Sequence, residues 1–195
     1  MVPAKSLVAP ELTRLVALLR AGGVVACPTE TFVGLLADAR DAGAVAAVCE
    51  LKGRGVNQPI GVLIPDLAAL DLVAIDIAPR ARELAQRHWP GALSLVLCAR
   101  PELPDALKRD GTVSVRVPGP SPALDLVRAF GGPLTATSAN RTGEPATRNA
   151  AEVRAVFGDA LAAIVEGESP GGLASTIIDA TTSQLRVLRV GPIDI

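Results

Sequence analysis

Helical and extended patterns alternate along the whole chain, and this alternation restricts the possible folds more than any other feature. Short apolar runs suited to buried strands are separated by segments in which apolar residues recur at helical spacing. Between residues 11 and 20, for example, leucine and valine side chains share one helical face, and two glycines then end the helix. The alternation predicts an α/β domain in which helices flank one mixed sheet.

Several expected elements begin or end at a residue with a physical signal. Asp41 can cap a helix that Gly53 closes, and Asn149 followed by Glu152 resembles a capping box. The expected helices span residues 11–20, 41–51, 79–88, 121–130 and 149–157. The expected strands span residues 24–27, 60–64, 93–98, 112–117, 134–137, 164–165, 176–180 and 185–190, of which the last two suggest an antiparallel portion. No linker or repeat interrupts this pattern, so residues 1–195 are expected to form one domain.

Composition excludes several classes of protein. Apolar residues make up 49% of the 195 residues and charged residues 20%, which excludes an intrinsically disordered chain. Nineteen basic residues against 20 acidic ones argue against a strongly basic nucleic-acid coat protein. With one Trp, three Phe and no Tyr, the chain has little from which to build a base-stacking platform.

The cysteine and histidine content also argues against a stapled or metal-centred fold. Three cysteines lie far apart and there is one histidine, so neither a disulfide framework nor a structural zinc site is expected, and no metal ligands are assigned. No apolar run approaches the roughly 18 residues of a membrane span. We therefore expect a cytoplasmic protein without a membrane partner.

Common catalytic motifs are missing from the sequence. It contains no GxxxxGK[ST] loop, no GxGxxG turn, no GxSxG elbow and no HExxH pair. These absences argue against an ordinary P-loop hydrolase, a dinucleotide-binding enzyme, a serine hydrolase and a zinc protease. The chemistry is instead expected at strand ends that carry hydroxyl and cationic groups.

Two of these polar segments lie in the first third of the chain. The residues Pro28-Thr29-Glu30-Thr31 follow an apolar strand directly, either as a turn that caps a helix or as hydroxyls at a sheet edge where α/β ligands bind. Lys52-Gly53-Arg54 follows a helix end, either as charge that complements the helix dipole or as two cations that grip a polyphosphate.

The remaining polar segments lie in the second half. In the strand 112–117 the valines take one face, while Thr112, Ser114 and Arg116 share the other, which is either an exposed face or the wall of a cleft. The strand from residue 134 ends in Thr-Ser-Ala-Asn, and two glycines precede Ser175. Together the segments predict an anion-lined cleft without an obvious general base, which favours phosphoryl or nucleotidyl transfer run by positioning and electrostatics.

Seven ordered segments carry a resemblance to a known family: GGVVACPTETFVGL, LKGRGVNQP, HWPGALSLVL, VSVRVP, TATSANRTGEPAT, ASTIID and VLRVG. From about residue 10 to residue 193, the chain resembles the YrdC-like family, and within it the threonylcarbamoyl-AMP synthases. The resemblance implies a YrdC-like fold, in which a twisted α/β sheet surrounds a deep, positively charged cavity. It also implies the single-domain form of the family.

The resemblance implies an activity as well. Synthases of this family convert L-threonine, bicarbonate or CO2, and ATP into L-threonylcarbamoyl-AMP with release of pyrophosphate, and Mg2+ accompanies the ATP. A downstream tRNA threonylcarbamoyl-transferase machinery would then use the product. Two alternatives stay open: a non-enzymatic RNA-binding module, and a sibling enzyme that uses another amine or carbamoyl donor.

Site residues are implied by matching the family's motifs. Its KxR and SxN pair is present, with Lys52 and Arg54 as the residues expected to act in catalysis and to hold phosphates. The ATP contacts expected from the match are Lys52, Arg54, Gln58, Thr112, Ser138, Ala139, Asn140, Thr147 and Arg189. The threonine contacts expected from it are Thr31, Arg116, Thr137 and Ser175, with the guanidinium of Arg116 pairing with the substrate carboxylate.

The chain departs from the family pattern at Val33, Leu63 and Ala174, where many members have tyrosine, histidine and proline. These positions are expected to lie in the amino-acid pocket, so they bear on selectivity for threonine. No general base is assigned; Glu30 is the nearby candidate, and a helix-capping role is the preferred interpretation for it.

Overall fold

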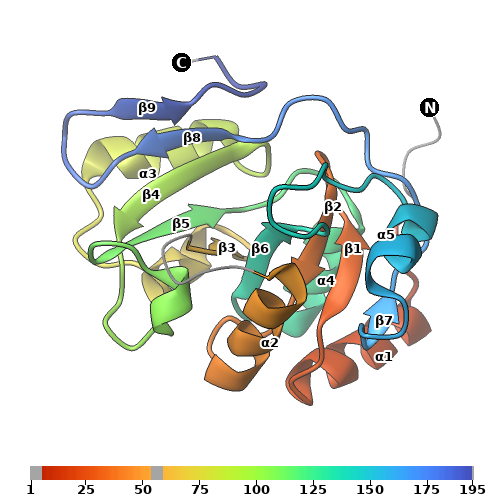
Figure 1. Ribbon diagram of the computed structural model, residues 1–195. Coiled ribbons are helices and arrows are strands. Elements are labelled where there is room, and N and C mark those ends of the chain that lie inside the picture. The colour runs from red at the N-terminus through yellow and green to blue at the C-terminus, as the bar shows by residue number, and fades with distance from the viewer. Residues whose placement is uncertain (1–5, 54–58, 195) are drawn as a thin grey trace.

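The computed structural model describes residues 6–53 and 59–194, and within them a nine-stranded sheet runs through the molecule (Figure 1). The order of its strands is β7-β1-β2-β6-β3-β5-β4-β8-β9. Their bounds are β1 Val25–Pro28, β2 Val33–Leu36, β3 Gly61–Leu63, β4 Leu93–Cys98, β5 Thr112–Arg116, β6 Leu134–Ser138, β7 Ala163–Ile164, β8 Thr176–Asp179 and β9 Arg186–Arg189.

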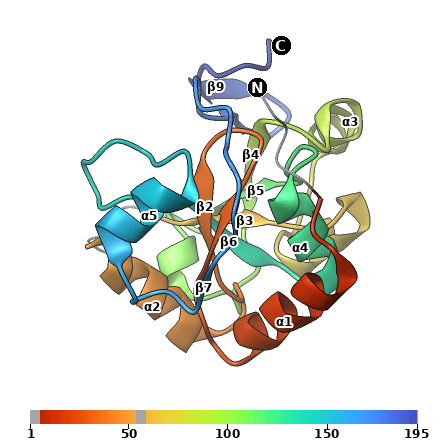
Figure 2. The ribbon, with the colours of Figure 1, turned by 90° about the vertical axis from the view of Figure 1, so that its right-hand side faces the viewer.

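Strand pairing is mixed, as predicted. The pairs β1–β7, β3–β5 and β4–β8 are parallel, and the other neighbours are antiparallel, including β8–β9 at the end of the chain. The helices are α1 Ala9–Arg20, α2 Ala42–Lys52, α3 Pro79–His88, α4 Pro122–Phe130 and α5 Ala150–Phe157. Figure 2 shows α1 and α4 on one side of β1, β2 and β6, with α2 and α5 on the other.

The helix signals in the sequence are confirmed by the geometry. The Asp41 carboxylate accepts hydrogen bonds from the amides of Gly43 and Ala44 at 2.8 and 3.2 Å, and Gly53 ends α2 in the left-handed conformation at φ 58°. The Asn149 side chain accepts from the amide of Glu152 at 3.0 Å at the start of α5. Local side-chain chemistry therefore determines where these helices begin and end.

One strand was not predicted. Residues 33–36 form β2, which pairs antiparallel with β1 and β6. Its four residues are all buried, so the run has no alternation of polar and apolar positions. It also includes a glycine, Gly34, which is uncommon in strands. The polar segment 28–31 is consequently a turn between two strands, and the interpretation that it caps a helix is wrong. Two short 3₁₀ turns, Leu67–Leu72 and Asp105–Leu107, were also not predicted.

No helix among residues 6–53 and 59–194 is both long and apolar enough to cross a bilayer. The core is aliphatic, and the largest fully buried side chains are mainly leucine and isoleucine. Thr135 in β6 is a fully buried polar residue, and its hydroxyl accepts from the amide of Ala37 at 2.9 Å and donates to the carbonyl of Leu35 at 3.0 Å. This hydroxyl therefore satisfies backbone groups where β2 ends beside β6.

We predict that Thr135→Val destabilises the fold. Valine matches the shape of threonine but leaves the buried amide of Ala37 without its acceptor, which costs roughly 1–3 kcal/mol. Urea unfolding should show a free energy of unfolding lower by about 2 kcal/mol. The matched control is Thr13→Val on the exposed face of α1, which should change it by about 0.5 kcal/mol or less. Equal unfolding midpoints for Thr135→Val and the unchanged protein would contradict the prediction.

Candidate active site

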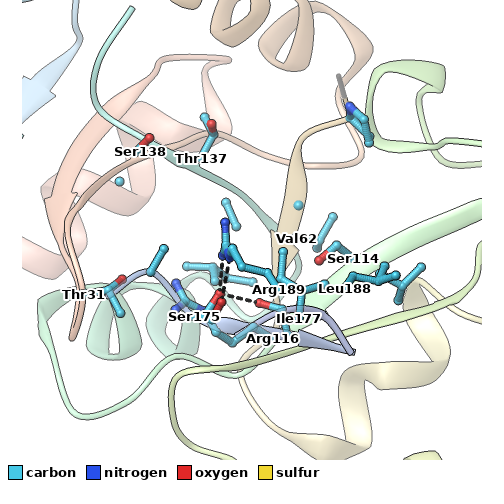
Figure 3. Close-up of a pocket in the computed structure, with 18 of the residues that line it drawn as sticks. Thr31, Val62, Ser114, Arg116, Thr137, Ser138, Ser175, Ile177, Leu188 and Arg189 are labelled. Carbon is cyan, nitrogen blue, oxygen red and sulfur yellow. Dashed lines mark hydrogen bonds between the residues drawn. The ribbon is translucent and has the colours of Figure 1, made fainter. Parts of the chain in front are cut away.

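A cavity of about 810 Å3 opens on one face of the sheet. Seven of the residues predicted for the site line it: Thr31, Thr112, Arg116, Thr137, Ser138, Ser175 and Arg189. They come from turns and strands far apart in the sequence, and Figure 3 shows most of them facing a common space. Arg54 and Gln58, also predicted for the site, lie outside the described residues.

Strand β5 forms one wall of the cavity. Thr112, Ser114 and Arg116 line it, whereas Val113 and Val115 point into the core and are almost completely buried. The alternation seen in the sequence therefore separates a cavity face from a core face. Of the two interpretations of this strand, the cleft wall is confirmed.

Arg116 is held by a carboxylate from the turn between β1 and β2. Its Nη1 donates to Oε1 of Glu30 at 2.7 Å, and the side chains are only 11% and 15% exposed. Glu30 packs against Gly119, where an added Cβ would lie 2.9 Å from its Cγ. The preferred interpretation of Glu30 as a helix cap is therefore wrong, because a strand follows and the carboxylate pairs with a residue 86 positions away.

The second carboxylate oxygen of Glu30 is buried and has no hydrogen-bond partner among the described residues. Glu30 itself is not among the residues that line the cavity. The carboxylate therefore orients Arg116 from behind the cavity wall. Glu30 does not face the cavity, as a general base would have to.

Arg189 in β9 reaches the cavity beside Arg116. Its Nε donates to the carbonyl of Ser175 at 2.9 Å and its Nη2 to the hydroxyl at 3.0 Å, as Figure 3 shows. The Ser175 hydroxyl also contacts that of Ser94 at 3.0 Å. Desolvation lowers the pKa of Arg189, and the charge of Arg116 lowers it further. An anion placed between the two guanidinium groups would oppose this lowering, because a nearby negative charge favours the protonated form.

Lys52 and the 138–140 turn do come together, as the KxR and SxN pairing predicts. The ammonium of Lys52 is nearly fully buried and donates to the carbonyls of Ser138 and Asn140 at 2.6 and 2.7 Å and to Oδ1 of Asn140 at 3.3 Å. The Ser138 hydroxyl also bonds to that Oδ1. Lys52 thus joins the end of α2 to the turn that follows β6.

Four predicted residues lie behind the cavity wall rather than in it: Lys52, Ala139, Asn140 and Thr147. Among them, the Thr147 hydroxyl donates to the carbonyl of Ala139 at 2.7 Å. The side-chain amide of Asn140 donates to the carbonyl of Glu144 at 2.7 Å. These contacts hold the segment after β6 in place, so the structure gives this group a supporting position behind Ser138.

Sequence reasoning missed the acidic groups at the cavity. Asp179, at the end of β8, lines it, pairs with Arg186 at 3.1 Å and accepts from the Thr181 hydroxyl at 2.7 Å. The bond from Thr181 is the main cause of the lowered pKa of Asp179. The Asp-x-Thr spacing after a strand is a local turn signal that predicts this contact.

Comparison with known proteins gives the family. Residues 17–191 match the family described as Telomere recombination (Sua5_yciO_yrdC). This chain belongs to the Sua5/YciO/YrdC family. A Mycobacterium tuberculosis protein, provisionally named threonylcarbamoyl-AMP synthase, is 40% identical over 180 residues, which are 91% of this chain and 82% of that one. The threonylcarbamoyl-AMP synthase of Bacillus subtilis is 37% identical over 94% of this chain and 54% of its own.

A solved structure of the family has the same fold. The crystal structure of Pyrococcus abyssi Sua5 complexed with L-threonine superposes with a TM-score of 0.91 at 34% identity, over 97% of this chain and 56% of that one. The chain thus spans a little more than half the length of the Bacillus and Pyrococcus relatives. The YrdC-like fold and the family membership expected from the sequence are confirmed.

The three residues at which the chain departs from the family pattern, Val33, Leu63 and Ala174, all line the cavity. Val33 and Leu63 are almost completely buried, so they add apolar surface to the wall near Thr31 and Arg116. Val33, Leu63 and Ala174 thus make their part of the cavity wall apolar.

We predict that Lys52→Met destabilises the protein. Methionine fills similar space but leaves the carbonyls of Ser138 and Asn140 without the charged donor, and each such bond contributes roughly 1.5–3 kcal/mol. Chemical denaturation should show a free energy of unfolding lower by about 3 kcal/mol. Lys108→Met is the control, because Lys108 bonds to Pro101 and Asp105 at the surface. Such surface contacts contribute about 1 kcal/mol or less to the free energy of unfolding. An equal loss in the two variants would count against the role assigned to Lys52.

Proposed function

We propose that this protein is a threonylcarbamoyl-AMP synthase, which makes L-threonylcarbamoyl-AMP from L-threonine, bicarbonate or CO2, and ATP and releases pyrophosphate. Two relatives that share 37–40% identity over most of this chain have that name, one of them provisionally. A relative of the same fold has been crystallised with L-threonine. The product would pass to a downstream machinery that transfers the threonylcarbamoyl group to tRNA.

One observation carries the proposal: Arg116, Arg189 and the hydroxyls of Thr31, Ser138 and Ser175 converge on a single cavity from separate strands and turns. Its volume of about 810 Å3 lies within the range of roughly 300–1,000 Å3 that small-molecule sites occupy. Cationic donors and neutral hydroxyls in one cavity suit a ligand that has both an anionic tail and a small polar body.

In the proposed amino-acid subsite, Arg116 binds the carboxylate of threonine. Glu30 occupies Nη1, so Nε and Nη2 form the edge of the guanidinium that a carboxylate can bind with two hydrogen bonds. Thr31, Thr137 and Ser175 line the same cavity and supply hydroxyls for the remaining polar groups of the substrate.

The proposed nucleotide subsite is the part of the site next to Ser138. Lys52 and Asn140 hold the turn that presents the Ser138 hydroxyl, while Ala139 and Thr147 brace it from behind. Lys52 and Arg54 together are proposed to favour the anionic phosphates electrostatically. Gln58, Thr112 and Arg189 complete the proposed ATP contacts.

Mg2+ is proposed to accompany ATP. The described residues contain no group of three or more His, Cys, Asp or Glu side chains placed to hold a metal ion. We propose that substrate phosphates and water molecules hold the ion, as is common for Mg2+. When bound, it would offset the charge of the phosphates.

The chemistry joins the substrates through two new bonds. The unprotonated amine of threonine bonds to the carbon of CO2 as one carbon–oxygen π bond opens, and the nitrogen then gives a proton to water, which leaves a carbamate. A carbamate oxygen then bonds to the α-phosphorus as the bond from that phosphorus to the pyrophosphate oxygen breaks. The contribution of the chain is to hold the carboxylate end of threonine through Arg116 and the nucleotide through the 138–140 turn, which supplies proximity.

The proposal is tested by incubating the purified protein with ATP, L-threonine and bicarbonate and measuring L-threonylcarbamoyl-AMP by mass spectrometry and pyrophosphate by a coupled assay. Both products should need all three substrates. A preference for another amine would overturn the choice of threonine. Strong, steeply salt-dependent RNA binding without turnover would instead favour an RNA-binding module.

We predict that Arg116→Lys lowers kcat/KM for threonine by about 10- to 100-fold, because an ammonium cannot reproduce the two parallel hydrogen bonds of a guanidinium. The KM for ATP should change by less than about threefold. Arg148→Lys is the control, since Arg148 pairs with Glu168 at an exposed site 3.4 Å apart. Steady-state kinetics with each substrate varied in turn provide the measurement, and a larger change for ATP than for threonine would refute the assignment.

A further inference from the structure

Two threonine hydroxyls meet in the turn between β1 and β2. Thr29 and Thr31 both line the cavity, are 5% and 8% exposed, and have their Oγ1 atoms 3.1 Å apart. Either oxygen can donate in such a contact when it is considered alone. The other bonds of Thr29 decide which one does.

A threonine hydroxyl has one proton and two lone pairs. Thr29 Oγ1 lies 2.7 Å from the carbonyl oxygen of Phe32, and because a carbonyl only accepts, the Thr29 proton is directed there. Thr29 Oγ1 also accepts from the amide of Thr31 at 3.1 Å. The contact between the two hydroxyls therefore uses the proton of Thr31, and Thr29 accepts.

Contacts from another segment of the chain hold the turn in this arrangement. The amide of Thr29 donates to the hydroxyl of Ser169 at 3.2 Å, and Ser169 is fully buried. The amide of Gly171 donates to the carbonyl of Thr31 at 2.7 Å. The hydroxyl of Thr29 is therefore not free to turn towards the cavity without losing buried bonds.

We propose that Thr29 fixes Thr31 as a hydrogen-bond acceptor towards the ligand, so that this side of the cavity selects an N–H or O–H group of the substrate and disfavours a carboxylate. This inference rests on the proposed function, because it assigns one end of the amino-acid subsite. Thr29 is a positioning residue, and Thr31 is the residue that contacts the substrate.

The two arginines that line the cavity have the complementary polarity. Arg116 and Arg189 have donors and no acceptors, so they receive the carboxylate. An amino acid has its carboxylate at one end and its amine, with the β-hydroxyl of threonine, at the other. Donors on β5 and β9 and an acceptor on the β1–β2 turn therefore favour one orientation of the substrate, with its carboxylate at the arginines and an N–H or O–H group at Thr31.

The first experiment measures KM for L-threonine in four proteins: unchanged, Thr29→Val, Thr31→Val and the double variant. Each single change should raise KM about tenfold, with a KM for ATP that changes by less than about twofold. Because Thr29 acts through Thr31, the double variant should be no worse than Thr31→Val alone. If the double variant instead combines the increases in KM of the two single variants, Thr29→Val merely disturbs the turn, and the proposal is overturned.

Two further arms sharpen the test. Thr29→Ser keeps the hydroxyl and should restore KM to within about twofold of the unchanged protein, whereas failure to do so would count against a role for the hydroxyl. Repeating the Thr31→Val comparison with L-2-aminobutyrate, which keeps the amine but lacks the β-hydroxyl, identifies the donor. If Thr31→Val raises KM for L-2-aminobutyrate as much as for threonine, the donor is the amine. If KM for L-2-aminobutyrate does not rise, the donor is the β-hydroxyl of threonine.

The two levels of proposal fail in different ways. If the unchanged protein makes no threonylcarbamoyl-AMP, the proposed function fails. If it does so but Thr31→Val leaves KM for threonine unaltered, the function stands and the assignment of Thr31 as an acceptor for the substrate is wrong.

Discussion

The ion pair between Glu30 and Arg116 is the interaction on which the rest of the site depends. A guanidinium that is only 11% exposed needs a partner, and the carboxylate of Glu30 lies 2.7 Å from it. Glu30 comes from the β1–β2 turn, and two strands, β6 and β3, separate β2 from β5 in the sheet. The pair ties the β1–β2 turn to β5, so the hydroxyls of Thr29 and Thr31 stand in a fixed relation to the cation. It also offsets one positive charge, which lets Arg189 approach the same space.

Much of the fold follows from local sequence signals. Asp41, Ser121 and Asn149 cap the helices that follow them, and the predicted bounds of α3 and β4 are those of the structure. Strand β2 was missed because all four of its residues are buried, and a strand buried on both faces does not need the alternation that marks a half-exposed one. Four apolar residues that include a glycine do not by themselves indicate a separate strand.

The site was predictable only where its chemistry is local. The face of β5 that lines the cavity could be read from the alternation of Thr112, Ser114 and Arg116 with valine. The partner of Arg116 could not, because Glu30 lies 86 positions away and the residues around Glu30 equally suit a helix cap. Lys52 is similar: its acceptors include the main-chain carbonyls of Ser138 and Asn140, which any residue type would provide. Such contacts depend on the tertiary fold and have no pattern in the sequence.

A net charge of −1 says little about the cavity, because most of the charged residues that line it are arranged in pairs. Among the described lining residues, Arg116 pairs with Glu30, Arg186 with Asp179, and Arg109 with Asp110 at 3.6 Å. Arg189 differs, since its bonds within the described part of the chain go to the neutral Ser175. Its charge is therefore left for a ligand to balance, which agrees with the lowering of its pKa by desolvation first and by Arg116 second. A chain of nearly balanced charge thus concentrates its attraction for anions at one point, next to the guanidinium proposed to hold the amino acid.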